Sequence, residues 1–424
     1  MSSKNKAALV PKLRFPEFCQ TGGWIPKRLK DACEVNPANS VLPERFVYVD
    51  LESVEAGKLT ARKTITRDEA PSRAQRLLHP DDVIFQIVRP YQRNNFHFKG
   101  SEGLDYVAST GYAQLRAKDS ADFLFQAVHV DGFVDRVIAK CTGSSYPAIN
   151  SSDLAEVPLA IPKPDEQQKI ADCLSSLDEL INAQARKVDA LKTHKKGLMQ
   201  QLFPREGETQ PRFRFPEFKE DGLWERKPFS DLCDVKHGYA FESEFFSSEG
   251  EYVLLTPGNF YEQGGYRDRG ELQKYFIGEI PLGYVLAKGD MLVAMTEQAA
   301  GLLGSPILVP ESGKFLHNQR LGLVISKPDI AWTNEFFFYV FNTDGVRKAI
   351  HDTASGAKVR HTSPTKIGDV MITVPTTLPE QQRIALCLSS LDALITAETQ
   401  KLEVLKINKT GLMQQLFPSL EEEK

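Results

Sequence analysis

The chain has 424 residues, 41% of them hydrophobic and 25% charged, which fits a soluble globular protein with two or three domains. No run approaches the roughly 20 apolar residues that a membrane span needs. The polar start MSSKNKAALVPK is no signal peptide, so we expect a cytoplasmic protein. The formal net charge of −4 does not by itself suggest nucleic acid. Residues 58–99, however, hold nine Lys or Arg against four Asp or Glu, and a local basic excess is typical of DNA-binding surfaces.

The first variable segment combines strand-like runs with side chains of the types that read DNA. FVYVDL at 46–51 and DDVIFQIV at 81–88 are rich in β-branched and aromatic residues, which predicts strands. In IVRPYQRNNFHFK at 87–99, basic and amide residues alternate with aromatic ones. Arg and Lys can bond bidentately to guanine in the major groove, and Asn and Gln to adenine, whereas other basic residues suit phosphates. We expect base-edge contacts from Arg89, Gln92, Arg93, Asn94, Asn95 and Lys99, and phosphate contacts from Lys63, Arg67, Arg73 and Arg76. For each single residue, a solvated surface side chain is the alternative.

The first unit is expected to close with a helix, a turn and a strand. An amphipathic stretch near 123–138 predicts the helix, and VPLAIP at 157–162 predicts the strand. The turn after Gly143 contains Ser144, Ser145 and Tyr146, and small residues with polar neighbours suit a loop that approaches a phosphate backbone. A tight turn with no ligand would have the same sequence pattern.

A long helix is predicted from Glu166, where apolar residues recur in steps of three, four and seven. This seam consists of Ile170, Leu174, Leu177, Ile181, Val188 and Leu191. The block continues for roughly 30–35 residues before Pro204, which gives a helix of about 45–50 Å. Because the helix is not apolar all round, its seam must be buried. It packs either against a second such helix in a coiled coil or against its own domain.

A polar linker, REGETQP at 205–211, precedes a second unit with the same order of elements. Strands are predicted at 252–255, 290–295, 321–326 and 370–375, a helix near 334–350, and a turn at Gly356. Its candidate DNA contacts are Thr296, Gln298, His317, Asn318, Gln319, Arg320, Lys358, Arg360 and His361. Its seam consists of Ile384, Leu388, Leu391, Ile395, Leu402 and Leu405.

The chain therefore contains an internal repeat. Residues 166–204 and 380–418 are about two-thirds identical at an offset of 214 residues. RFPEF at 14–18 recurs at 214–218, and Trp24 has its counterpart in Trp224. Between these matched blocks lie two long stretches with little visible similarity. A repeat with constant ends and variable middles predicts one shared partner and two different targets.

Motifs of catalysis and metal binding are missing from the sequence. There is no Walker A loop, no HExxH, no GxSxG, and no Cys or His cluster at metal spacing. This absence favours a binding protein with no catalytic residue and no metal site. Two other classes stay open, namely a protein–protein scaffold and a self-sufficient DNA methyltransferase or nuclease with degenerate motifs.

The repeated blocks resemble a known family. The helix start EQQ-I-A-x-C-L-S-S-L-D, the strand end before it, the LMQQLFP close and the duplication around variable segments resemble the specificity subunit of Type I restriction–modification systems. The resemblance covers residues from about 11 to 418. It is strong in the helical blocks and weak in the variable segments.

The resemblance implies an α+β fold with a pseudo-two-fold internal repeat, in which two mixed target recognition domains are joined by two long antiparallel helices in a coiled coil. The expected boundaries are 1–163 and 205–378 for the recognition domains, 164–204 and 379–418 for the helices, and 419–424 for a tail. Each domain would read half of a split, asymmetric site in double-stranded DNA. The helices would set the spacing and dock two methyltransferase subunits, joined in the complex by two motor–nuclease subunits. S-adenosylmethionine, ATP and Mg²⁺ would bind those partners, and this chain would bind no cofactor. A related system with fused methyltransferase and nuclease activities is a close variant.

Overall fold

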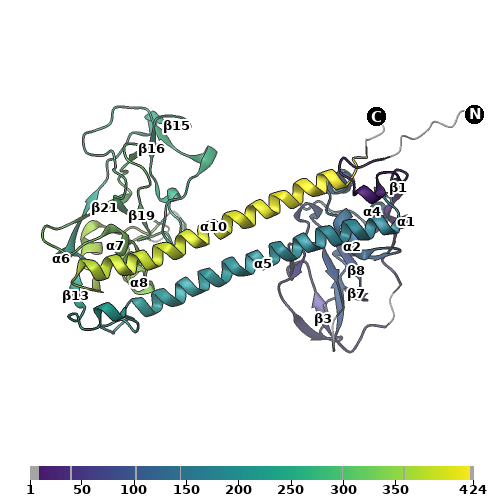
Figure 1. Cartoon of the computed structure of the whole chain (residues 1–424), viewed down its shortest axis with the longest axis horizontal. Coiled ribbons are helices and arrows are strands. Elements are labelled where there is room, and N and C mark those ends of the chain that lie inside the picture. The colour runs from purple at the N-terminus through teal and green to yellow at the C-terminus, as the bar shows by residue number, and fades with distance from the viewer. Residues whose placement is uncertain are drawn as a thin grey trace, which may run out of the picture. The chain divides into compact units, whose positions relative to one another are not determined.

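The computed structural model describes residues 9–38, 41–100, 103–143, 145–297, 299–356 and 359–420. The chain divides into two compact units, one formed by Met1–Arg186 with Thr399–Lys424 and the other by Lys187–Glu398. Each long helix contributes residues to both units (Figure 1). The chain segment of one repeat therefore does not correspond to one compact unit.

The first unit is built from two four-stranded sheets and several short helices. One sheet has the order β2-β11-β8-β9 and the other β6-β3-β10-β7, and β1 pairs with β12 beside them. The strands are β1 (Ile25–Arg28), β2 (Cys33–Val35), β3 (Arg45–Val49), β4 (Val54–Glu55), β5 (Lys58–Leu59), β6 (Lys63–Thr66), β7 (Ala74–Leu78), β8 (Asp82–Gln86), β9 (Phe96–Phe98), β10 (Asp105–Ser109), β11 (Tyr112–Ala117) and β12 (Pro158–Ile161). The helices are α1 (Leu29–Ala32), α2 (Ala121–Ala127), α3 (Asp131–Ala139), α4 (Ser151–Ala155) and the first part of α5 (Pro164–Leu202).

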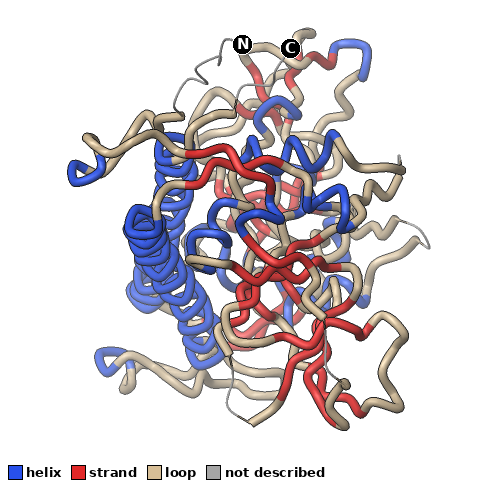
Figure 2. Tube along the Cα trace, turned by 90° about the vertical axis from the view of Figure 1, so that its right-hand side faces the viewer, coloured by secondary structure: helices blue, strands red, loops and turns tan. Residues whose placement is uncertain are grey.

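The second unit repeats this plan with shorter strands. Its sheets have the orders β14-β21-β18-β19 and β15-β17-β16-β20, and β13 pairs with β22. The strands are β13 (Glu225–Pro228), β14 (Cys233–His237), β15 (Phe246–Ser247), β16 (Tyr252–Leu254), β17 (Tyr275–Phe276), β18 (Met291–Ala294), β19 (Pro306–Leu308), β20 (Phe315–Leu316), β21 (Leu321–Ser326) and β22 (Met371–Val374). The helices are α6 (Phe229–Leu232), α7 (Asn334–Phe341), α8 (Asp344–Asp352), α9 (Pro364–Gly368) and the first part of α10 (Leu378–Leu416). Figure 2 shows the strands of the chain in red and the loops between them in tan.

The two units share the direction of their strand pairs and the capping of one helix as well as their topology. In each, one sheet is antiparallel throughout and the other contains a parallel pair, β3 with β10 and β16 with β20. The helices α2 and α7 start at Ser120 and Thr333, whose hydroxyls accept a hydrogen bond from the third residue of the helix. Side chains of this kind at helix starts stabilise a helix by about 1 kcal/mol. The variable segments thus keep the same fold although their residues differ.

The predicted elements are largely confirmed. Strands occur within 46–51, 81–88, 157–162, 252–255, 290–295, 321–326 and 370–375 as expected. The single helices predicted near 123–138 and 334–350 are each two helices, because the chain turns at 128–130 and 342–343. The long helices each have 39 residues rather than the predicted 30–35, since each begins two residues before the matched block and continues to two residues before the proline that closes it.

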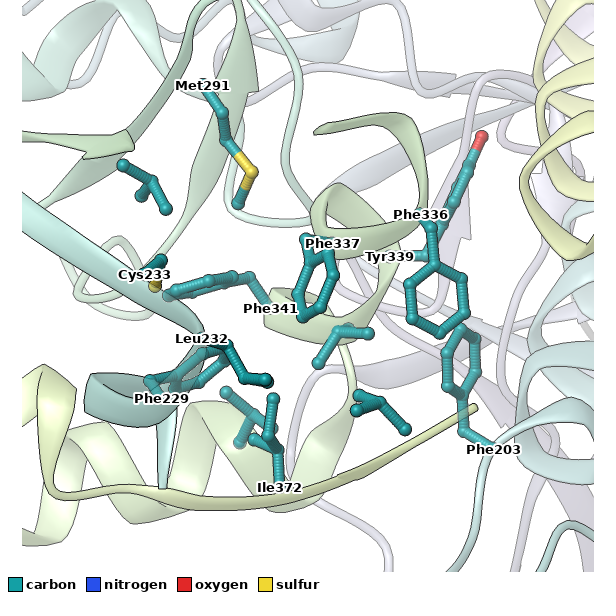
Figure 3. Close-up of a cluster of buried hydrophobic side chains, with 14 of the residues drawn as sticks. Phe203, Phe229, Leu232, Cys233, Met291, Phe336, Phe337, Tyr339, Phe341 and Ile372 are labelled. Carbon is teal, nitrogen blue, oxygen red and sulfur yellow. The ribbon is translucent and has the colours of Figure 1, made fainter. Parts of the chain in front are cut away.

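Each unit has a hydrophobic core that includes the end of a long helix. In the second unit, Phe203 at the end of α5 packs against Phe336 of α7 with ring centroids 5.7 Å apart (Figure 3). Phe229 stacks on Phe341 in the same core, with 4.4 Å between centroids. In the first unit, Phe417 after α10 takes the matching place beside Trp24. The LFP close of each repeat therefore completes the core that the other repeat begins.

The predicted helix seam divides into two kinds of position. The first residues of each seam are buried in the core of the unit where the helix begins, namely Ile170, Leu174, Ile384 and Leu388. Farther along, Val188 and Leu402 are buried, whereas Leu177, Ile181, Leu191, Leu391, Ile395 and Leu405 are half-buried. The first seam positions thus follow the alternative in which a helix covers its own domain.

Matched ion pairs join the two helices inside each unit. In the first unit, Lys409 of α10 donates to both carboxylate oxygens of Asp178 of α5, at 2.7 and 2.8 Å. In the second unit, Lys195 donates to Asp392 at 2.5 Å. The two pairs are repeat counterparts, because Lys195 and Lys409 are 214 residues apart in the sequence, as are Asp178 and Asp392. In the second unit, Lys187 also donates to Glu398 at 2.6 Å, so residue numbers rise along α5 as they fall along α10 and the two helices run in opposite directions there.

A buried ionic fork connects each N-terminal segment to the start of a long helix. The guanidinium of Arg14 donates two hydrogen bonds to the carboxylate of Glu166, both 2.7 Å long, and Trp24 Nε1 donates a third at 3.1 Å. The side chains of Arg14 and Glu166 are 6% and 2% exposed. Arg214, Glu380 and Trp224 repeat this arrangement at 2.7, 2.7 and 3.0 Å. The RFPEF and EQQ repeats therefore serve one structural purpose, which spacing along the chain does not reveal.

Candidate nucleic-acid interface

The best-defined candidate surface is a loop at the end of the antiparallel sheet in each unit. We call residues 142–148 and 355–361 the return loops, of which Ser144, Ala357 and Lys358 lie outside the described residues. In the first unit, Arg89 N–H donates to Pro147 O at 2.8 Å and Ile149 N–H donates to Ile87 O at 3.0 Å. In the second, Glu297 N–H donates to Arg360 O at 2.9 Å and Thr362 N–H to Met295 O at 3.0 Å. The same backbone frame therefore holds different side chains in the two units.

A second pair of bonds closes each return loop on itself. Thr142 and Ala148 exchange two backbone hydrogen bonds, of 2.9 and 3.0 Å, and Ser355 and His361 exchange two of 3.0 and 2.8 Å. Gly356 has φ +113°, and a Cβ there would lie 2.1 Å from Val359 O, so only glycine fits this turn. The predicted turns at 143 and 356 thus lie at the tips of a backbone frame that the two units share.

In the first unit, residues 89–93 hold an unusual backbone. A short 3₁₀ turn, Pro90–Gln92, lies between Arg89 and Arg93, both left-handed with φ +55°. Non-glycine residues in this region cost about 1–3 kcal/mol and occur preferentially at functional sites. The Arg89 guanidinium lies 4.3 Å from the centre of the Tyr146 ring, which is a cation–π contact. Two predicted residues far apart in sequence, Arg89 and Tyr146, are therefore brought together.

Most of the other predicted residues of 87–99 bond to protein groups in or next to their own loop. Arg93 pairs with Asp131 at 2.7 Å, and Lys99 pairs with Asp122 at 2.5 Å. The amide ends of the remaining three residues bond to neighbouring protein groups: Gln92 accepts from Gln86 Nε2, Asn94 from Ala56 N–H, and Asn95 from Gln86 N–H. Asn95 is 1% exposed. These contacts shape the loop from which Arg89 and Tyr91 project.

The four predicted phosphate contacts are not one cluster. Lys63 lies on β6 and Arg67 follows it, whereas Arg76 lies on β7 and Arg73 precedes it, and these strands form opposite edges of their sheet. Arg67 donates to the carbonyls of Leu42 and Pro43. Arg76 is half-buried, and burial lowers the pKa of its guanidinium. Arg73 is exposed, and its carbonyl accepts from Thr110 N–H at the return-loop end of the sheet.

In the second unit, three of the predicted segments meet. Thr296 Oγ1 lies 3.2 Å from His361 Nδ1, and Met295 N–H donates to Arg320 O at 3.0 Å. Gln319, Arg320, Arg360 and His361 are exposed, whereas Thr296, His317 and Asn318 are buried. The predicted residues Ser144, Gln298 and Lys358 lie outside the described residues, and Ser145 is an exposed member of the first return loop.

His317 gives the second unit a pH-sensitive core. Burial lowers the pKa of its imidazole to about 4, and its Nε2 lies 2.9 Å from Leu321 O. The unfolded chain binds the proton near pH 6.5, so the contribution of His317 is complete above that value and is lost as the pH falls toward 4. We expect the second unit to lose about 2 kcal/mol between pH 7 and pH 5 through this residue. Urea unfolding at both pH values should show the loss in the native chain and a smaller loss in His317→Gln.

A cavity beside the second return loop was not predicted from the sequence. It has a volume of about 230 Å³ and is lined by Glu297, Gly301, Leu303, Arg347, Lys348 and His351. Burial lowers the pKa of Arg347 to about 10, and its Nη1 has no hydrogen-bond partner among the described residues. The signal in the sequence is weak. Arg347, Lys348 and His351 form one polar face of a short amphipathic helix, and many surface helices have such a face.

No group of three or more His, Cys, Asp or Glu side chains in the described residues is placed to hold a metal ion. Among the same residues, no helix is both long enough and apolar enough to span a membrane.

Two β-rich units of one topology, each with different side chains on the same return-loop frame, define a protein built from two related but distinct modules. The family model for the type I restriction modification DNA specificity domain matches residues 23–193 and 222–406. The chain belongs to this family.

Similar proteins carry related names. The Type I restriction enzyme MjaVIII specificity subunit of Methanocaldococcus jannaschii is 24% identical over 279 residues, which cover 65% of this chain and 64% of that protein. The EcoBI specificity subunit of Escherichia coli is 28% identical over 182 residues, 42% of this chain and 35% of the relative. This chain thus matches less than two-thirds of the length of either relative.

Two solved structures share the fold. The Type I restriction–modification S subunit from M. genitalium superposes with a TM-score of 0.59 at 14% identity, covering 97% of this chain and 100% of that one. A chain from a study of complex assembly and conformational transition of the type I R–M system gives 0.55 at 23% identity, covering 94% and 98%. At these identities the likeness concerns the fold.

Proposed function

We propose that this chain is the non-catalytic DNA-recognition subunit of a Type I restriction–modification complex, in which each unit reads one half of a split, asymmetric site. The observation that carries the proposal is the pair of return loops. One backbone frame presents Arg89 and Tyr146 in the first unit and Glu297 and Val359 at the matching places in the second. Different groups on the same frame suit two different half-sites, because base edges are read by side chains.

We further propose that α5 and α10 form a continuous coiled coil that fixes the distance between the half-sites. The support comes from the matched pairs Lys409–Asp178 and Lys195–Asp392, and from the half-buried seam between them. Repeat-related surfaces on two such helices suit two copies of one partner, which we take to be methyltransferase subunits. Two motor–nuclease subunits would join through the complex in the cytoplasm. The partner subunits would bind S-adenosylmethionine, ATP and Mg²⁺. A fused methyltransferase–nuclease partner is the closest variant.

A protein–protein scaffold is the competing class of function. It would bury its return loops against peptides and would show no preference among DNA duplexes. A recognition subunit should bind duplex DNA with an affinity that falls as salt rises and should select a bipartite sequence. The two classes therefore differ in a single binding measurement.

The test selects duplexes from a randomised library with the full chain and its methyltransferase. We expect two short fixed sequences with a gap of constant length. Inserting seven residues into both long helices should lengthen the gap by about three base pairs, since a heptad adds about 10 Å. Both half-site sequences should be unchanged. Selection of no sequence would contradict DNA recognition, whereas an unchanged gap would contradict only the spacer.

A further inference from the structure

Arg89 differs from the other cations of its loop. Arg93 and Lys99 are neutralised by Asp131 and Asp122. In the part of the chain that the structure describes, the Arg89 side chain makes no ion pair, and its guanidinium faces the Tyr146 ring at 4.3 Å. Stacking uses the flat face of a guanidinium and leaves its in-plane N–H groups free to donate. The stack therefore holds the guanidinium in place while its N–H groups stay available as hydrogen-bond donors.

The backbone places this fork at the end of the antiparallel sheet, where Arg89 is half-buried beside the exposed Tyr146. Arg89 is fixed in the left-handed region, with φ +55°, by the bond from its N–H to Pro147 O. Tyr146 is 64% exposed and Tyr91, two residues after Arg89, is 51% exposed. Two exposed aromatic rings near an unneutralised arginine form a surface that is costly to leave in water and suited to a flat ligand.

We propose that Arg89, positioned by Tyr146, reads a guanine through its O6 and N7 in the major groove of the half-site bound by the first unit. Arg93 is then a positioning residue that fixes the loop through Asp131 and through the carbonyl of His129. This proposal rests on the proposed function. It gives different roles to Arg89 and Arg93, which the sequence alone does not distinguish.

The second unit cannot make the same contact. Its matching residue is Glu297, whose N–H occupies the same place in the frame and whose carboxylate accepts from Gly301 N–H at 3.1 Å. A carboxylate repels the O6 and N7 acceptors of guanine. The guanine contact therefore belongs to one half-site, and its loss should leave the other half-site intact.

The experiment compares selected duplexes for the native chain, Arg89→Ala, Arg89→Lys and Arg93→Ala, each assembled with the methyltransferase. We expect Arg89→Ala to lose one guanine preference in one half-site, with discrimination falling roughly 5- to 150-fold. Arg89→Lys should bind with similar salt dependence but weaker guanine preference, because it keeps the charge without the fork. Tyr146→Phe should behave as the native chain and Tyr146→Ala should share the loss. Replacing the selected guanine with 7-deazaguanine, which lacks the N7 acceptor, should weaken only binding by chains that retain Arg89.

Other outcomes overturn the proposal. An equal loss on every sequence with a salt slope reduced by about one would make Arg89 a phosphate contact. Indifference to 7-deazaguanine would exclude the bond to N7 and with it the bidentate contact. Loss of the same guanine in Arg93→Ala but not in Arg89→Ala, at unchanged thermal stability, would move the role to Arg93. If the native chain selects no sequence, the proposed function itself fails. Thermal unfolding of each variant separates these results from misfolding, and retained selection in the second half-site reports that the chain is folded.

Discussion

Glu166→Ala should lower the free energy of unfolding of the first unit by about 3–5 kcal/mol, because it leaves the Arg14 guanidinium buried without its charge partner. The side chain of Arg14 is 6% exposed, and its remaining bonds would be to the carbonyls of Thr21 and Gly22 and to the Thr21 hydroxyl. Trp24 Nε1 would lose its acceptor as well. Three buried hydrogen-bond donors, two from Arg14 and one from Trp24, would therefore lose the carboxylate that they share.

The neighbouring pair Lys169–Glu17 supplies the matched control. It joins the same two segments at 3.1 Å, but its side chains are 50% and 47% exposed. Glu17→Ala should therefore have little effect on the free energy of unfolding, because solvent screens an exposed pair. Hydrogen exchange followed by mass spectrometry can assign each loss to a unit. Equal effects of Glu166→Ala and Glu17→Ala would show that the fork does not stabilise the fold.

The repeat allows an internal replicate. Glu380→Ala removes the same carboxylate from Arg214 and Trp224, so a similar loss should appear in peptides of the second unit. A Glu380→Ala loss in the first unit only would contradict the division of the chain into these units.

The sequence predicted the repeated scaffold well because its signals are local. Heptad spacing, turn residues and alternating strands each act over a few residues, so the long helices and most strands could be located. The ionic fork could not, since Arg14 and Glu166 are 152 residues apart and each alone resembles an ordinary surface charge. The two RFPEF and EQQ copies hint at a shared role, but only the fold shows that they meet.

The candidate site shows a similar limit. Arg89 and Arg93 are the same residue type in the same loop, and both have φ +55°. Their partners, Tyr146 and Asp131, come from other segments of the chain, and these decide which arginine is neutralised. Residue type therefore locates the loop, whereas tertiary contacts assign the roles within it.

Phe417→Ala should destabilise the first unit by about 3–5 kcal/mol, the usual cost of removing a buried aromatic side chain. Its ring is 8% exposed and packs against Trp24 and Phe123, with centroids 5.7 and 5.5 Å away. The chain reaches this core only at its far end, after the second repeat has been built. Residues near Trp24 should therefore lose hydrogen-exchange protection although the substitution lies almost 400 residues away in sequence.

Ile407→Ala is the control for Phe417→Ala, because Ile407 lies on α10 in the same unit but is 68% exposed. Its removal should change the free energy of unfolding by no more than about 0.5 kcal/mol. If Phe417→Ala only increased exchange in the last turn of α10, the LFP segment would be a frayed end rather than part of the core. If it weakens β1 and α2 as expected, the first unit cannot reach full stability until the last residues of the second repeat have packed against it. In that case the stability of the first unit depends on residues at the end of α10, which belong to the second repeat. A chain truncated before Phe417 should therefore unfold more readily in the first unit than in the second, although the first unit is synthesised earlier.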